Sequence, residues 1–186
     1  MRHPVLRTLL FFVLATTLTA PLHAAETYKE ITWETLVPKG WDPTSDMKKL
    51  DLGKLQDSDP KATEALQKIK EMWDNAPTEP SLQGTRVRLP GFVVPLDRKG
   101  DKVTEFLLVP YFGACIHTPP PPANQIIHVI SKTPQAKLNT MDSVWVSGVI
   151  TLQHSDTPWG GAGYRLTVEK ISPYKTPYKG SRLDLF

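Results

Sequence analysis

The stretch that decides the fold is Thr85-Arg-Val-Arg-Leu-Pro-Gly-Phe-Val-Val-Pro-Leu96. Its first half alternates polar and apolar residues, as a strand with one buried face does, and its second half is almost wholly apolar. Pro90 and Gly91 stand in the middle, and a glycine inside a long strand marks a bend or a bulge. Small barrels close by bending long strands, so this stretch favours a barrel.

Four further strand patterns follow along the chain. They cover residues 103–109, 125–130, 142–152 and 164–171, and the third of them carries Gly148 near its centre. Five strands, two of them long and interrupted by glycine, predict an all-β protein built on a small OB-like five-stranded barrel. A five-stranded open sheet is the competing arrangement.

One packed α-helix is expected before the barrel, over residues 59–75. Asp59 is a good N-cap, and Pro60 suits the first helical position. Apolar residues recur at three- and four-residue spacing and give the helix one apolar face for packing on the sheet. These residues are Ala62, Ala65, Leu66, Ile69, Met72 and Trp73.

The segment before that helix is interpreted as an N-terminal arm. Trp33, Leu36 and Trp41 are its apolar anchors, and they either dock on the barrel or contact another protein. The chain then divides into a signal peptide (residues 1–25), the arm and helix (26–83), the barrel domain (84–172) and an extended C-terminal tail (173–186).

The first 25 residues have the pattern of a secretory signal peptide. Arg2 and Arg7 precede an apolar run from Leu9 to Leu18, and small residues end the segment at Ala25. The run is too short for a stable transmembrane anchor, and no cysteine at the cleavage point offers a lipid anchor. We therefore expect a periplasmic protein that is not embedded in the membrane.

Export also changes the charge balance of the chain. The whole sequence carries 22 Lys and Arg against 19 Asp and Glu, and removal of Arg2 and Arg7 leaves a net charge of +1. A nearly neutral domain lacks the basic surface that binds nucleic acid or anionic lipid. Nucleic acid is therefore not expected as a partner.

The only cysteine lies in Gly-Ala-Cys-Ile-His-Thr-Pro-Pro-Pro-Pro, residues 113–122. A lone thiol in an oxidising compartment is buried, holds a metal or reacts. In an extended segment Cys115 and His117 leave the same face, and a thiolate with an imidazole selects zinc or copper(I). His128 is the predicted third ligand, and Glu105 the fourth ligand or a hydrogen-bond partner of one.

Other interpretations of these residues stay open. Cys115 is equally suited to a packed core position, and His128 to a hydrogen-bonded core histidine. A thiol enzyme would pair Cys115 with His117 or His128 and use Asn124 as the orienting group. No second cysteine or Cys-x-x-Cys motif supports that chemistry, so no enzymatic activity is expected.

Besides a metal-binding protein and a thiol enzyme, a third functional class is an interaction module without chemistry of its own. Such a module would dock on the periplasmic face of a transporter, with the aromatic residues Trp159, Tyr174 and Tyr178 as contacts. Metal binding and docking are compatible.

Residues 88–96 and 105–125, with Thr-Trp-Glu-Thr-Leu-Val-Pro at residues 32–38, resemble an uncharacterised family of secreted bacterial proteins, a domain of unknown function. Members are often encoded beside ABC-transporter components and zinc-related periplasmic proteins. The resemblance therefore implies a role in metal homeostasis, with an ABC-transporter component or a periplasmic metal-binding protein as partner. The matching motif residues are Cys115, His117 and Asn124.

Overall fold

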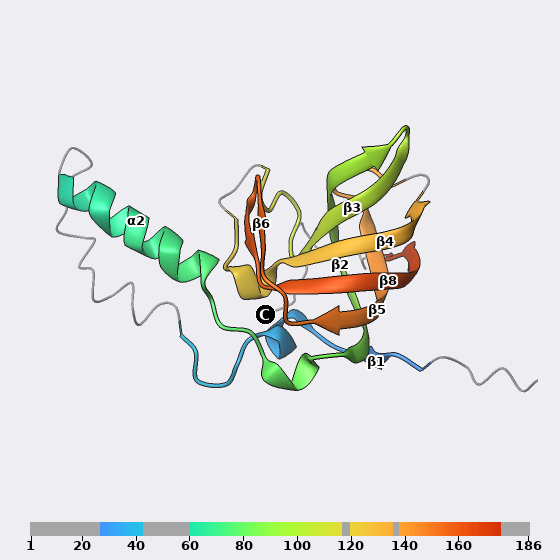
Figure 1. Cartoon of the computed structure of the whole chain (residues 1–186), viewed down its shortest axis with the longest axis horizontal. Coiled ribbons are helices and arrows are strands. Elements are labelled where there is room, and N and C mark those ends of the chain that lie inside the picture. Colours follow the sequence, from blue (N-terminus) through green and yellow to red (C-terminus); the bar gives the residue numbers. More distant parts are fainter. Residues whose placement is uncertain (1–26, 43–59, 117–119, 136–137, 176–186) are drawn as a thin grey trace, which may run out of the picture.

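The computed structural model describes residues 27–42, 60–116, 120–135 and 138–175 (Figure 1). The expected signal peptide, the rest of the arm (43–59), His117 and the tail beyond Lys175 lie outside these residues. Five strands form the core of the structure: β2 (Thr85–Lys99), β3 (Lys102–Val109), β4 (Ile127–Gln135), β5 (Ser143–Thr151) and β8 (Tyr164–Pro173).

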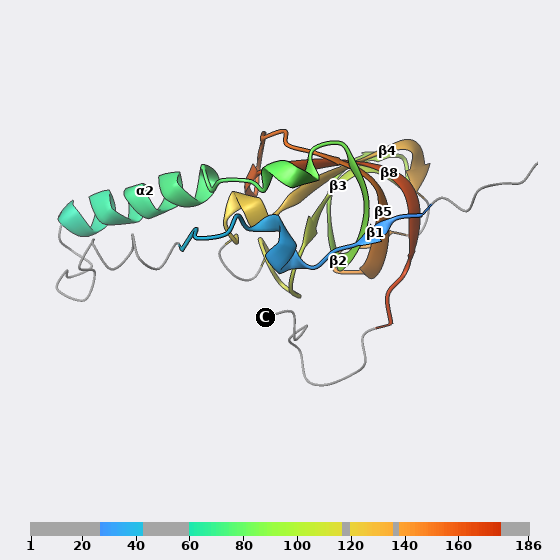
Figure 2. The ribbon, with the colours of Figure 1, turned by 90° about the horizontal axis from the view of Figure 1, so that it is seen from below.

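These strands pair in a closed ring. β2 pairs antiparallel with both β3 and β5, β3 with β4, and β8 with β5, whereas β4 and β8 run parallel. β2 pairs with β3 along one edge and with β5 along the other, so the row of five strands closes on β2 (Figures 1 and 2). The predicted all-β five-stranded barrel is confirmed, and the open sheet is excluded.

Two glycines allow the barrel strands to bend and approach one another. A Cβ added at Gly91 would lie 2.7 Å from Cγ of Leu108 and 2.9 Å from the indole ring of Trp33. A Cβ added at Gly148 would lie 2.1 Å from the carbonyl oxygen of Thr167. At both positions only glycine fits the close approach that closes the barrel.

The arm closes one end of the barrel. β1 (Lys29–Glu30) adds to β2 in parallel, and the short 3-10 helix η1 (Trp33–Leu36) follows it. Trp33 and Leu36 are buried in the core, and the Trp33 indole donates a hydrogen bond to the carbonyl of Pro90 at 2.9 Å. The docking expected of these two residues is observed, whereas Trp41 is half-buried.

One α-helix, α2 (Pro60–Asp74), precedes the barrel, in close agreement with the predicted range. Both views show it pointing away from the barrel, with its C-terminal end nearest to it (Figures 1 and 2). There it meets a hairpin that the sequence did not predict, β6 (Ser155–Thr157) and β7 (Gly160–Ala162). The Gly161 amide donates to the Asp74 carboxylate at 3.4 Å.

Two further 3-10 turns complete the described elements, η3 (Pro80–Leu82) and η4 (Ala123–Gln125). No helix among the described residues is long and apolar enough to cross a bilayer.

Candidate functional site

A second apolar cluster lies outside the barrel. Side chains of β2 and β3 pack there against the loop that follows β3, against Ile126 just before β4 and against the β7 strand. Its buried members are Phe92, Val94, Leu107, Val109, Ala114, Cys115, Ile126 and Ala162. OB barrels commonly bind oligonucleotides or oligosaccharides on the face of their second and third strands. Here β3 and β4 are those strands, and the chain's own loop covers part of their outer face.

Cys115 belongs to this cluster and adopts an unusual backbone conformation. Its φ is 66°, in the left-handed region that favours glycine, and only 8% of its surface is exposed. Burial raises the pKa of the thiol to about 11. A nucleophilic or exchanging cysteine needs a lowered pKa, so this environment does not favour the thiol-enzyme alternative.

Cys115 also lines a cavity that we call the α2 groove. The groove has a volume of about 610 Å³ and lies between α2, the proline-rich loop and the β6–β7 hairpin. Its lining is mainly apolar, from Leu66, Ile69, Trp73, Cys115, Pro120, Pro121, Pro158 and Trp159. The apolar face of α2 was expected to pack on the sheet; of that face Ala65 is buried, whereas Leu66 is 64% exposed.

Glu105 and His128 form a pair on the outer face of β3 and β4. His128 Nε2 lies 2.9 Å from Glu105 Oε2, and the His128 side chain is 11% exposed against 39% for Glu105. The pair forms because His128 stands opposite Leu107, two residues from Glu105 on the same strand face. His128 Nδ1 is buried and has no hydrogen-bond partner within the described part of the chain.

The predicted metal ligands are therefore placed in two different settings. Glu105 and His128 are in contact, Cys115 lines the α2 groove, which neither of them lines, and His117 lies outside the described residues. Within the described ranges, no group of three His, Cys, Asp or Glu side chains is arranged to hold an ion.

Two other polar side chains, those of Asn124 and His154, have local partners. Asn124 is fully buried, and its side-chain amide donates to the carbonyl of Pro77 at 2.9 Å, which fixes the segment after α2 to η4. His154 lies 3.2 Å from the exposed carboxylate of Asp156. Asn124 therefore has a structural contact of its own, and His154 is a surface residue.

Comparisons with known proteins agree on a family. A family described as "Protein of unknown function (DUF3299)" matches residues 33–173. A crystal structure of a DUF3299 family protein from Pseudomonas aeruginosa PAO1 is 33% identical, with a TM-score of 0.62 over 83% of this chain and 99% of that one.

Two structures of asparaginyl-tRNA synthetase from Pyrococcus horikoshii, one complexed with asparaginyl-adenylate, match 52% of this chain at 22% identity. The matches cover 20% and 21% of the synthetase chains. Their TM-scores of 0.33 and 0.32 are too low to support any argument. No curated protein matches. The match over residues 33–173, together with the similar structure, shows that the chain belongs to the DUF3299 family of proteins of unknown function.

Proposed function

We propose that this protein is an exported binding module that docks an apolar segment of a partner protein in the α2 groove. One observation carries the proposal. Among the described residues, three large hydrophobic side chains are strongly exposed, and two of them, Leu66 and Trp159, line this groove at 64% and 38% exposure. Exposed apolar side chains gathered at one concave site mark an interaction surface.

The charges of the groove define the chemistry of its partner. Among the residues that the structure describes, Lys70 and Asp74 are the only charged ones that line it, and they form an ion pair with each other. A charged segment would lose water without gaining an opposite charge, whereas an uncharged apolar segment would bury its surface against leucine, isoleucine and tryptophan. The two tryptophans are of the type that supplies most binding energy at interfaces.

The cellular setting proposed for this module is the periplasm, and the partner an ABC-transporter component. The signal-peptide pattern of residues 1–25 supports export, and the resemblance described above supports the transport link. Cell fractionation with mass determination of the mature N-terminus tests export: processing near Ala25 is expected, and an unprocessed cytoplasmic protein would contradict it.

Site-specific photo-crosslinking in producing cells tests docking. A photoreactive phenylalanine analogue placed at Leu66 probes the groove, and the same analogue at Lys132, an exposed residue of β4, is the matched control. We expect one predominant partner from the Leu66 position alone. The partner is then purified, and Leu66→Asp and Trp159→Ala are each expected to weaken its binding at least tenfold by titration calorimetry. Equal crosslinking from both positions, or unchanged affinity of both variants, would reject the groove as the docking site.

A metal site is the second candidate, and the orientation of His128 favours it. Histidines that bind metal with one ring nitrogen usually place the other on a carboxylate, as His128 Nε2 does with Glu105. The unpartnered Nδ1 is then the available ligand atom. We propose zinc, or copper(I), as the ion, with Cys115 and His117 as the further ligands. Cys115 lines the α2 groove, and within the described residues it does not form one ligand group with Glu105 and His128.

A further inference from the structure

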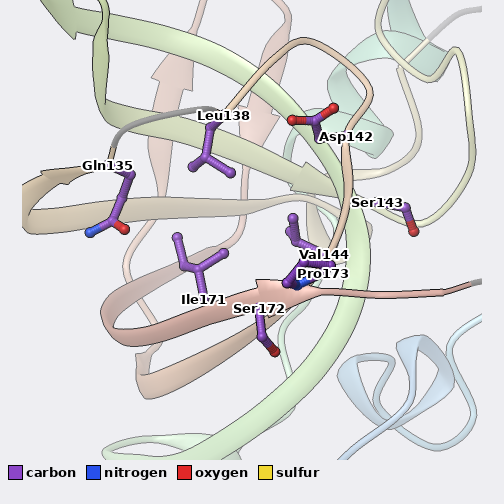
Figure 3. Close-up of a pocket in the computed structure, with 8 residues that line it drawn as sticks. All are labelled: Gln135, Leu138, Asp142, Ser143, Val144, Ile171, Ser172 and Pro173. Atoms are coloured by element: carbon purple, nitrogen blue, oxygen red, sulfur yellow. The ribbon is translucent and has the colours of Figure 1, made fainter.

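A second cavity lies at the end of the barrel away from the arm. It has a volume of about 430 Å³ and is bounded by the ends of β4 and β8, the start of β5 and the turn before β5. Figure 3 shows Leu138, Val144 and Ile171 directed toward one another across this space. Leu138 and Val144 belong to the barrel core, so the cavity, which we call the mouth cavity, leads from solvent onto the core.

The turn that frames the mouth cavity is held in a fixed conformation. Met141 has a φ of 65°, in the left-handed region that methionine rarely adopts. Two backbone hydrogen bonds tie this turn to β2: Met141 N donates to the Val93 carbonyl at 2.7 Å, and Val93 N donates to the Asp142 carbonyl at 3.1 Å. Strained backbone persists where its surroundings fix it, often at sites that clamp a ligand. The backbone of this turn is therefore fixed before any ligand binds.

The lining gives the mouth cavity an acidic rim above an aliphatic floor. Asp142 is the only charged residue among the eight that line it, and the other polar ones are Gln135, Ser143 and Ser172. Asp142 Oδ2 accepts a hydrogen bond from the Asn139 amide at 2.8 Å, which fixes the carboxylate. The neighbouring Arg98 does not line the cavity, and its guanidinium donates to the Asp101 and Leu138 carbonyls at 3.4 Å.

We propose that the mouth cavity binds a small aliphatic ammonium ion, with the alkyl chain against Leu138, Val144 and Ile171 and the ammonium group at Asp142. The volume falls in the range of small-molecule sites, which often occupy the mouths of β-barrels. A single carboxylate selects a cation over an anion. This site is separate from the α2 groove, so the proposal does not depend on the docking function.

Methyl NMR of the mature protein, labelled at leucine, valine and isoleucine, tests the proposal with three probes of equal chain length: n-hexylammonium, 1-hexanol and hexanoate. Saturable shifts of the Leu138, Val144 and Ile171 methyl signals are expected with hexylammonium. Affinity should rise about fourfold per methylene from butyl- to hexylammonium, as burial of each methylene requires. Hexanoate should bind at least tenfold more weakly.

A matched pair of variants tests the role of the carboxylate. Asp142→Asn keeps an oxygen to accept the Asn139 hydrogen bond, and it should reduce hexylammonium affinity about fivefold, to that of hexanol. Asp156→Asn, which changes a fully exposed carboxylate in the β6–β7 hairpin, should leave affinity unchanged. Absence of saturable shifts in the wild type, equal binding of hexanoate, or unchanged affinity in Asp142→Asn would overturn the proposal.

Discussion

The hydroxyl of Tyr164 donates a hydrogen bond to the carbonyl of Leu36 at 2.6 Å and accepts one from the amide of Glu79 at the same distance. A single fully buried side chain of β8 thereby joins the arm and the segment after α2 to the barrel. The arm is therefore a fixed part of the barrel end, because its removal would leave a buried hydroxyl without its acceptor.

Replacement of Tyr164 by phenylalanine should destabilise the protein by about 2 kcal/mol or more, because a buried carbonyl and a partly buried amide lose their partner at once. Urea unfolding followed by tryptophan fluorescence measures the change. Tyr174→Phe is the control, since Tyr174 contacts Trp145 through its ring and lies at the exposed end of the chain's described part. Similar losses in both variants would contradict the role assigned to the Tyr164 hydroxyl.

Tyr164 also predicts that the stability of the folded protein depends on pH in alkaline solution. Burial raises the pKa of Tyr164 to about 12 from an ordinary value of 10.0. The folded state therefore holds the proton more tightly than the unfolded state, so this contribution to stability is complete below pH of about 10 and is lost as the pH rises toward about 12. The unfolding free energy of the wild type should fall more steeply over this range than that of Tyr164→Phe, and parallel curves would disprove the effect.

Gly148→Ala should prevent the barrel from closing properly. Its Cβ would lie 2.1 Å from the backbone oxygen of Thr167, and a strand backbone cannot move aside as a flexible side chain can. We expect a loss of about 3 kcal/mol or more, or failure to fold. Gly100→Asn is the control, because Gly100 has open space around it and a φ of 67° that asparagine tolerates. Normal stability of Gly148→Ala by thermal unfolding would show that the strands can separate there.

The strands and the helix could be predicted from sequence because their signals are local. Alternation in residues 85–96 and three- and four-residue spacing in α2 each depend on neighbouring residues alone. The β6–β7 hairpin was missed because its strands have three residues each and one of them is largely glycine. Turn chemistry dominates such a short segment.

The candidate sites were only partly accessible to sequence reasoning. The proximity of Glu105 and His128 was expected in outline, but their contact depends on the pairing of Leu107 with His128, which is a matter of register. The α2 groove was missed because the apolar face of an amphipathic helix indicates burial in general and does not name the surface it meets. The mouth cavity involves residues from three strands and a turn, and no sequence motif marks such a set.

The thiol of Cys115 should react slowly in the folded protein. Its pKa of about 11 leaves about a hundredth of the thiolate that a free cysteine has at neutral pH, and its side chain is buried. Native protein titrated with a disulfide reagent at pH 7.5 should react at least about 100-fold more slowly than urea-unfolded protein. Comparable rates would indicate an accessible thiol and would revive the enzyme alternative.

Metal content separates the second candidate function from a purely structural Glu105–His128 pair. If the pair belongs to a metal site, mature protein purified without chelator should carry about one equivalent of zinc or copper by elemental mass spectrometry, and Cys115→Ser and His128→Gln should each lose it while staying folded. Glu105→Gln should weaken binding about 10- to 100-fold, because it disturbs the carboxylate that orients His128.

His154→Gln is the matched control, since that histidine is paired with Asp156 on the surface. If the thiol is a ligand, a chelator should also accelerate its reaction with the disulfide reagent, whereas a merely packed thiol would be indifferent to the chelator. Absence of metal after reconstitution with zinc and with copper(I) would reject the metal site. The Glu105–His128 pair would then act only in stability, because its contact orders β3 against β4, and the α2 groove would stand as the functional surface.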